Sequence, residues 1–256
     1  MSTYAISDLH GQYGIFDKLL EKAGFSDADE LYMLGDAIDR GPDGIRILEH
    51  VMNAPNMHFL LGNHEFMMLN SVDPGGSAPV FGDTLPGRDA NLWLNYNGGD
   101  KTYSRYKRFK KNNRIKLLEW LYSCPLSTKV EVDGKTFILT HSFFDMDKID
   151  VPYKDLEYRE VWNIVWNSPF RADLFVDNER YRAYEPWTFV VGHVPVGHAR
   201  GGLLPIELSS YRVDNIIDID GGCSRHSKDD AAYKGGILLR LDDLSEFTVS
   251  FAEIKK

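Results

Sequence analysis

One stretch decides the fold of this chain, and it reads Leu31-Tyr32-Met33-Leu34-Gly35-Asp36-Ala37-Ile38-Asp39-Arg40. Its first four residues form an apolar run bounded by a glycine, which is typical of a short buried strand. Two carboxylates and a guanidinium follow within six residues. Charged groups so close to a buried strand end are costly unless a counter-ion neutralises them. The stretch therefore indicates either a divalent metal site or a solvated loop with an Asp–Arg pair.

Four other apolar runs, at residues 4–7, 58–61, 136–139 and 187–191, also end in polar residues that can bind a metal ion. The carboxyl ends of the strands in an open α/β sheet line the ligand crevice, so we expect these polar side chains to converge at one rim. Helical apolar spacing between the predicted strands favours an α/β fold. The candidate metal ligands are Asp8, His10, Asp36, Asn63, His141 and His193.

These six candidate ligands supply oxygen and nitrogen donors and no thiolate. Six donors are too many for one tetrahedral zinc ion and enough for two ions that share a carboxylate. Two-metal sites stabilise both the attacking and the leaving oxygen of an in-line displacement. We therefore expect a metal-bridging hydroxide to attack the substrate directly, without a covalent enzyme intermediate. Taken singly, each residue has a structural explanation, such as a helix cap for Asn63.

The composition limits the class of protein. A chain of 256 residues can form one large α/β domain. The formal net charge of −9 argues against nucleic acid as a partner. No signal peptide or membrane span is predicted, so we expect no membrane partner. Cys124 and Cys223 are far apart and lack CxxC spacing, which favours a reducing, cytoplasmic location.

Two regions lie between the groups of predicted strands. Residues 71–88 are rich in glycine and proline and predict a long loop, whereas residues 91–121 are predicted to be helical. The basic residues of the second region indicate a solvated helix face, with phosphopeptide docking as the alternative. These basic residues are Lys107, Arg108, Lys110, Lys111, Arg114 and Lys116. Alternating apolar residues at 237–241 and 247–251 predict a closing β-hairpin.

Three blocks of the sequence resemble the signature motifs of the PPP-type metallophosphoesterases: Asp8-Leu9-His10-Gly11, residues 35–41 and Gly62-Asn63-His64-Glu65. His141 and Gly192-His193 are similar to the later histidine blocks of that family. The subgroup that the chain resembles most is the small bacterial and phage serine/threonine protein phosphatases, through residues 93–99 and Val165-Trp166-Asn167.

This resemblance implies a single calcineurin-like metallophosphoesterase domain over residues 1–256, with variable inserts at about 71–122 and 145–186. It implies a four-layer α/β fold in which two central mixed β-sheets are sandwiched between helices. It also implies two metal ions, which could be Mn, Fe or Zn. One ion would be bound by Asp8, His10 and Asp36, and the other by Asp36, Asn63, His141 and His193.

The resemblance assigns catalytic roles as well. His64, oriented by Asp39, would protonate the leaving oxygen, because a carboxylate beside an imidazole favours its protonated form. Arg40 and Asn63 would bind the substrate phosphate. The second phosphate-binding arginine of the family is replaced by Ser168 in this chain. Nearby substitutes are Arg171, which we expect to take the role, and then Arg180 and Arg182.

The activity implied is hydrolysis of phosphomonoesters, with phosphoserine or phosphothreonine in a phosphoprotein as the first candidate substrate. Symmetrical hydrolysis of dinucleoside polyphosphates, or hydrolysis of another small phosphate ester, is the alternative. Asp39 and Glu65 disfavour it, because that subgroup tends to lack the former and to have Asp at the latter position. A non-catalytic scaffold would be expected to have lost ligands. Cysteine-dependent phosphatases and P-loop NTPases are excluded because Cys-x5-Arg and the P-loop motif are absent from the sequence.

Overall fold

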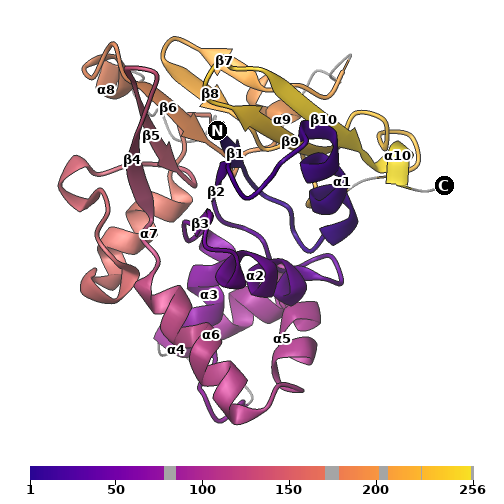
Figure 1. Cartoon of the computed structure of the whole chain (residues 1–256). Helices are drawn as coiled ribbons and strands as arrows, with labels where there is room; N and C mark the ends of the chain where they lie inside the picture. Colours follow the sequence, from indigo (N-terminus) through magenta and orange to yellow (C-terminus); the bar gives the residue numbers. More distant parts are fainter. Residues whose placement is uncertain (78–84, 171–178, 202–206, 226, 255–256) are drawn as a thin grey trace.

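Two mixed five-stranded β-sheets form the centre of the molecule, and helices cover their outer faces (Figure 1). The structure is a computed structural model that describes residues 1–77, 85–170, 179–201, 207–225 and 227–254. The strand order is β10-β9-β1-β2-β3 in the first sheet and β4-β5-β6-β8-β7 in the second. The predicted α/β fold with two central mixed sheets is therefore confirmed.

The first sheet is built around three parallel strands. β1, β2 and β3 run in the same direction and are connected by α1 (Tyr13–Ala23) and α2 (Gly44–Asn53). β9 pairs antiparallel with β1 and with β10, so the predicted C-terminal hairpin is confirmed. The strands of this sheet are β1 (Thr3–Ile6), β2 (Glu30–Met33), β3 (Met57–Phe59), β9 (Gly235–Arg240) and β10 (Glu246–Ser250).

The second sheet also has a parallel centre, formed by β5, β6 and β8. β4 and β7 lie antiparallel at its two edges, and the sequence did not predict either of them. The strands are β4 (Ser127–Val132), β5 (Lys135–Thr140), β6 (Thr188–Val191), β7 (Tyr211–Val213) and β8 (Ile216–Asp218).

The alternation of side chains in the second sheet separates two apolar cores. Leu139 and Val190 face the first sheet and pack in the core between the sheets. Their neighbours Ile138 and Phe189 point to the opposite face and pack against Tyr181, which lies in α8 (Glu179–Arg182). A third core joins the first sheet to α1, α2 and the helices of the middle region. These cores produce the predicted four layers.

Helical segments occupy most of the chain between β3 and β4. The long loop predicted for residues 71–88 is partly wrong, because Ser71 ends one helix and Leu85 begins the next; residues 78–84 lie outside the described residues. These segments are α3 (Asn63–Ser71), α4 (Leu85–Asn91), a π-helical turn η1 (Leu92–Tyr96), α5 (Asp100–Tyr106) and α6 (Lys111–Ser123). The remaining helical segments are η2 (Met146–Lys148), η3 (Tyr153–Asp155), α7 (Tyr158–Trp166), α9 (Val196–Ala199) and α10 (Phe251–Ile254).

One residue of the predicted solvated helix face is not solvated. Arg114 is only 9% exposed, whereas the other five basic residues of that run are exposed. Its guanidinium donates hydrogen bonds to four backbone carbonyl oxygens, which belong to Pro74, Gly75, Lys107 and Phe109. Arg114 therefore anchors the segment after α3 to the start of α6.

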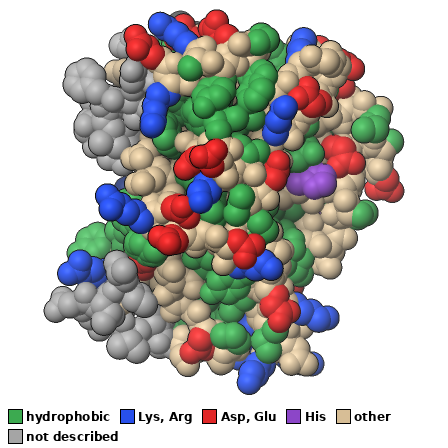
Figure 2. Space-filling model, turned by 90° about the vertical axis from the view of Figure 1, so that its left-hand side faces the viewer, with side chains coloured by type: hydrophobic (Ala, Val, Ile, Leu, Met, Phe, Trp, Pro, Cys, Tyr) green, Lys and Arg blue, Asp and Glu red, His purple; other side chains and the backbone are tan. Residues whose placement is uncertain are grey.

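Two further features of the described residues are the length of the helices and the distribution of charge on one face. In the part of the chain that the structure describes, no helix combines the length and the apolar character needed to cross a bilayer. On the face drawn in Figure 2, the described Lys and Arg side chains are interspersed with Asp and Glu and are not gathered into one basic patch.

The contacts of Arg114 predict a large effect on stability. Arg114→Ala should lower the free energy of unfolding by about 3 kcal/mol, because four partly buried carbonyls lose a charged donor. Urea denaturation measures this change. Lys116→Ala, on the exposed side of the same helix, is the matched control and should change stability by less than about 0.5 kcal/mol. Equal effects of the two substitutions would contradict the anchoring role.

Candidate metal centre

All six candidate ligands lie at the rim formed by the carboxyl ends of the parallel strands. Asp8 and His10 follow β1, Asp36 follows β2, and Asn63 is the first residue of α3 after β3. His141 and His193 follow β5 and β6 of the second sheet. The centre therefore spans the two sheets, as expected from the rule that ligands bind at the carboxyl ends of strands.

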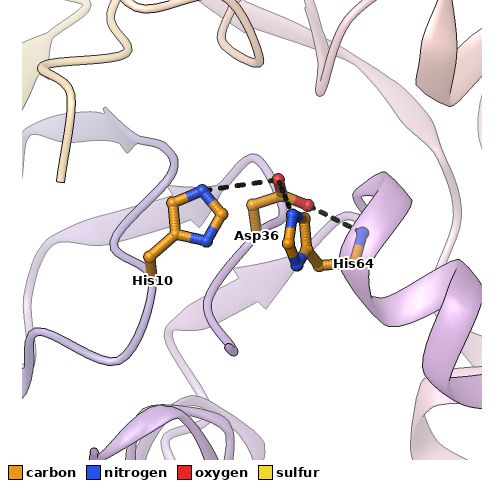
Figure 3. Close-up of side chains that lie close together, drawn as sticks. All are labelled: His10, Asp36 and His64. Carbon is orange, nitrogen blue, oxygen red and sulfur yellow. Dashed lines mark hydrogen bonds and ion pairs between the residues drawn. The ribbon is translucent and has the colours of Figure 1, made fainter. Parts of the chain in front are cut away.

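The carboxylate of Asp36 lies at the middle of this cluster. Its Oδ2 is 3.7 Å from Nε2 of His10 and 3.8 Å from Nε2 of His64 (Figure 3). Its Oδ1 is 3.6 Å from Nε2 of His141 and accepts a hydrogen bond from the backbone N–H of His64. Two groups able to hold a metal ion thus share one carboxylate: His10 with Asp36 and His64, and Asp36 with His141 and His193.

Asn63 and Asp8 complete the cluster from opposite sides. Oδ1 of Asn63 lies 3.0 Å from both Nε2 of His141 and Nδ1 of His193, and those two nitrogens are 3.3 Å apart. Oδ1 of Asp8 is 3.9 Å from Nε2 of His10, while its Oδ2 accepts hydrogen bonds from the Ser7 hydroxyl and the backbone N–H of His193.

The hydrogen bonds of two histidines fix which ring nitrogen faces the cluster. Nδ1 of His10 donates to the carbonyl of Ile38 at 3.1 Å, and Nδ1 of His141 donates to the carbonyl of Leu34 at 2.8 Å. A carbonyl oxygen only accepts, so both Nδ1 atoms carry the proton. Each Nε2 therefore presents a lone pair toward the carboxylate of Asp36, which is the form of histidine that binds a metal ion.

The electrostatics of the cluster fit bound cations. Burial, together with the nearby carboxylates of Asp220 and Glu65, raises the pKa values of Asp8 and Asp36 well above their usual range. Burial and the neighbouring His64 lower the pKa of His10 well below its usual value. A divalent cation offsets both effects, because it stabilises carboxylates in their ionised form and imidazoles in their neutral form. The donor set therefore fits one or more metal ions.

Two glycines let the loops approach closely enough to form the cluster. A Cβ atom on Gly62 would lie 2.2 Å from Oδ1 of Asp36, and one on Gly192 would lie 2.2 Å from Oδ2 of Asp8. The glycine spacers in these motifs therefore have a steric cause. Six residues of the site also hold a positive φ, which costs about 1 kcal/mol or more for each L-residue. They are Asp8, His10, Asp36, Asp39, Arg40 and His193.

Glu65 supports the loop that carries Asp36, a role that the sequence motifs alone did not assign. This buried carboxylate accepts hydrogen bonds from the backbone N–H groups of Asp36, Ala37, Ile38 and Gly62, at distances of 2.9, 3.0, 3.3 and 3.1 Å. Only half of a capping box is present, because glycine has no side chain: Glu65, the third residue of α3, accepts a hydrogen bond from the N–H of Gly62 just before the helix. A glutamate at this position of a helix is the signal in the sequence.

The predicted pair of His64 and Asp39 is in direct contact. Nδ1 of His64 lies 2.6 Å from Oδ2 of Asp39, and both side chains are buried. Burial raises the pKa of Asp39 to about 7 and lowers the pKa of His64 well below its usual value. Both shifts have the same cause, because burial disfavours the charged form of each group.

Arg40 reaches the cluster beside this pair. Its Nη1 donates to Nε2 of His10 at 3.0 Å, and its Nε is buried without a hydrogen-bond partner among the described residues.

Asp220, which follows β8, is, after Glu65, a second buried carboxylate near the cluster that the sequence did not mark as a site residue. Burial raises its pKa to about 6.

The second phosphate-binding arginine is not located. Arg171, the residue expected to take that role, lies outside the described residues. Arg182 makes two hydrogen bonds to the carboxylate of Asp214, at 3.0 and 2.8 Å. Its guanidinium is thus already paired with a carboxylate. Arg180 is exposed, and its guanidinium lies 5.6 Å from the ring centre of Phe143, just beyond the end of β5. Of these substitutes, Arg180 is thus the described arginine that remains available.

Fold and site together define a class of protein: an α/β protein with two stacked sheets whose strand ends bring aspartate and histidine side chains into metal-binding groups. Comparison with known proteins gives the family. The profile of the calcineurin-like phosphoesterases matches residues 1–226, and the chain belongs to that family.

Individual relatives carry different names. The chain is 30% identical over 144 residues to a symmetrical bis(5'-nucleosyl)-tetraphosphatase of Acidovorax sp. strain JS42, covering 56% of this chain and 44% of the relative. It is 28% identical over 148 residues to serine/threonine-protein phosphatase 2 of Salmonella typhimurium strain LT2, covering 57% and 61%. The chain thus spans less than two thirds of the length of these curated relatives.

Solved structures support the fold. A cold-active protein-tyrosine phosphatase of a psychrophilic Shewanella species superposes with a TM-score of 0.53 at 17% identity, covering 97% of this chain and 80% of that one. A metallophosphoesterase from Sphaerobacter thermophilus superposes with a TM-score of 0.52 at 17% identity, covering 97% and 86%.

The central position of Asp36 predicts that its charge is needed at both groups of ligands. Asp36→Asn should abolish tight binding of Mn²⁺ to the protein, because the carboxylate that both groups of described residues share becomes a neutral amide. Isothermal titration calorimetry on metal-stripped protein measures this loss. Asp17→Asn, an exposed change on α1, is the control and should bind Mn²⁺ as the unmodified chain does. Unchanged Mn²⁺ binding by the Asp36 variant would contradict a shared ligand.

Proposed function

We propose that this chain hydrolyses phosphate esters with two metal ions, one held by Asp8, His10 and Asp36 and the other by Asp36, Asn63, His141 and His193. The observation that carries the proposal is the single Asp36 carboxylate within 3.6 to 3.7 Å of a histidine Nε2 on either side. Two bound ions would supply the nucleophile by lowering the pKa of a coordinated water. Membership of the calcineurin-like phosphoesterase family supports the same chemistry.

Arg40 is proposed to bind the phosphate group. Its guanidinium lies at the edge of the cluster, with Nη1 3.0 Å from Nε2 of His10, and the N–H groups of a guanidinium match the geometry of phosphate oxygens. Asn63 borders the same space through its amide. Arg171 stays a prediction from the resemblance, with Arg180 as the alternative.

His64 is proposed to protonate the leaving oxygen. Its Nδ1 is hydrogen-bonded to Asp39, and its Nε2 faces the metal centre, 3.8 Å from Oδ2 of Asp36. A proton on Nε2 is therefore directed at the space beside Asp36, where a bound ester would lie. The carboxylate of Asp39 compensates for the burial that disfavours a protonated His64.

The presence of this acid favours esters with a poor leaving group. An alkoxide, such as the side chain of serine or threonine, must gain a proton as it leaves, whereas a polyphosphate leaves readily as an anion. Phosphoserine and phosphothreonine in proteins are therefore our first candidate substrates. Dinucleoside polyphosphates are the second candidate, and the name of the Acidovorax relative favours them.

A variant of His64 tests the proton donor. His64→Asn should lower kcat for phenyl phosphate about a hundredfold and for dinitrophenyl phosphate by less than about threefold, because a good leaving group needs little protonation. Steady-state kinetics of the Mn²⁺-loaded protein measures both values. The variant should still bind two Mn²⁺ ions, since His64 is not assigned as a ligand. A uniform loss across leaving groups, or the loss of one ion, would contradict the role.

Comparative kinetics tests the substrate class. We expect the Mn²⁺-loaded protein to hydrolyse p-nitrophenyl phosphate and, with a higher kcat/KM than the alternatives, a phosphoserine peptide. The alternatives are a phosphotyrosine peptide and diadenosine tetraphosphate. A higher kcat/KM for diadenosine tetraphosphate would replace the first candidate with the second. Absence of turnover with every ester, at full metal occupancy, would overturn the proposed activity itself.

A further inference from the structure

Residues 91–102, which we call the Trp93 segment, lie against the loop that holds Asp39 and Arg40. The segment contains the π-helical turn η1 and the first turn of α5. Two of its contacts are made by backbone atoms of that loop. The N–H of Arg40 donates to the carbonyl of Gly98 at 3.1 Å, and the N–H of Asp39 donates to the hydroxyl of Thr102 at 2.9 Å. The segment thus fixes the backbone of both residues.

A third contact reaches the side chain of Asp39. Nε1–H of Trp93 donates to Oδ2 of Asp39 at 2.8 Å, and this is the oxygen that also pairs with Nδ1 of His64 at 2.6 Å. The other carboxylate oxygen, Oδ1, is buried and has no hydrogen-bond partner among the described residues. Trp93 is completely buried. Two donors therefore meet at Oδ2, and the nearby hydroxyl of Thr102 also stabilises the charged form of this carboxyl and lowers its pKa.

Two glycines in the segment make this arrangement possible. A Cβ atom on Gly99 would lie 2.4 Å from Nε1 of Trp93, so a side chain there would displace the indole. Gly98 has a φ of +75°, and a Cβ atom on it would lie 3.0 Å from Cγ of Arg40. The Asn-Gly-Gly sequence therefore lets the backbone pass directly over Trp93 and Arg40.

We propose that Trp93 is a positioning residue for the proton donor: its indole N–H holds the carboxylate of Asp39 in the orientation that directs Nε2 of His64 toward the metal centre. The inference rests on the proposed role of His64 as the acid. Without the indole N–H, the Asp39 carboxylate loses one of the two donors at Oδ2, so its rotation about the terminal bond is less restricted. His64 then loses the fixed partner that sets its ring orientation.

The test is Trp93→Phe, which removes the N–H and keeps an aromatic ring in the buried space. We expect kcat for phenyl phosphate to fall about tenfold, while kcat for dinitrophenyl phosphate falls by less than about twofold, because only the poor leaving group needs the proton. KM and the binding of two Mn²⁺ ions should not change. Trp120→Phe is the matched control, because Trp120 is half-buried on α6 and packs on Phe59, outside the Trp93 segment.

A double-mutant cycle separates positioning from packing. In an Asp39→Asn background, Trp93→Phe should cause no further leaving-group-dependent loss, because the indole acts through that carboxylate. If Trp93→Phe does not fold, Thr102→Val is the substitute, because it removes the acceptor of the Asp39 N–H. It should lower kcat less than Trp93→Phe does, and again more for phenyl phosphate than for dinitrophenyl phosphate. An equal fall in kcat for both esters would overturn the inference. So would additive effects of Trp93→Phe and Asp39→Asn on kcat for phenyl phosphate.

The failure of this inference is distinguishable from failure of the proposed function. If His64→Asn gives a leaving-group-dependent loss and Trp93→Phe gives none, only the positioning role is wrong. If His64→Asn gives a uniform loss, the proton donor is wrong and the positioning role falls with it.

Discussion

The structure depends on a concentration of buried charge at one point, the carboxylate of Asp36. Three histidine rings and a second carboxylate, Asp8, surround it, and burial makes ionisation of both acids costly without a cation. The surrounding backbone is arranged to hold these groups in place despite that cost. Glu65 ties together the N–H groups of the Asp36 loop, and glycines at 62 and 192 allow side chains to approach where any Cβ atom would collide. Left-handed backbone at the ligands adds strain that the rest of the fold must support.

Two aspartates of one short loop have different roles. Asp36 lies among the candidate metal-binding histidines, whereas Asp39, three residues later, points toward Trp93 and Nδ1 of His64. Both carboxylates are buried, yet they have different partners: a set of histidine Nε2 atoms in one case and two N–H donors in the other. Such division of roles between neighbouring acids is set by environment, not by residue type.

Much of this could be predicted from the sequence because the decisive residues are close in sequence to the strands that position them. A ligand one or two residues beyond an apolar run has little freedom, so the sequence pattern alone assigns Asp8, Asp36 and His193 to the rim. β4 was missed because it lies at a sheet edge and alternates polar and apolar residues, with Thr128, Lys129 and Glu131 only partly buried or exposed. Trp93 and Arg114 acquire their roles through contacts made across 54 and up to 40 residues, which no local pattern contains.

The two sheets meet at the candidate metal centre, and this has a consequence for how distant parts of the protein affect the site. Asp8, Asp36 and Asn63 belong to one sheet and His141 and His193 to the other, so their spacing is set by the apolar layer between the sheets. Any change in the thickness of that layer, even one far from the rim, would alter the distance between the two halves of the ligand set. Ions bound by residues of both sheets would in turn stabilise the native arrangement of the two sheets relative to each other, because a ligand that binds only the folded state raises its stability.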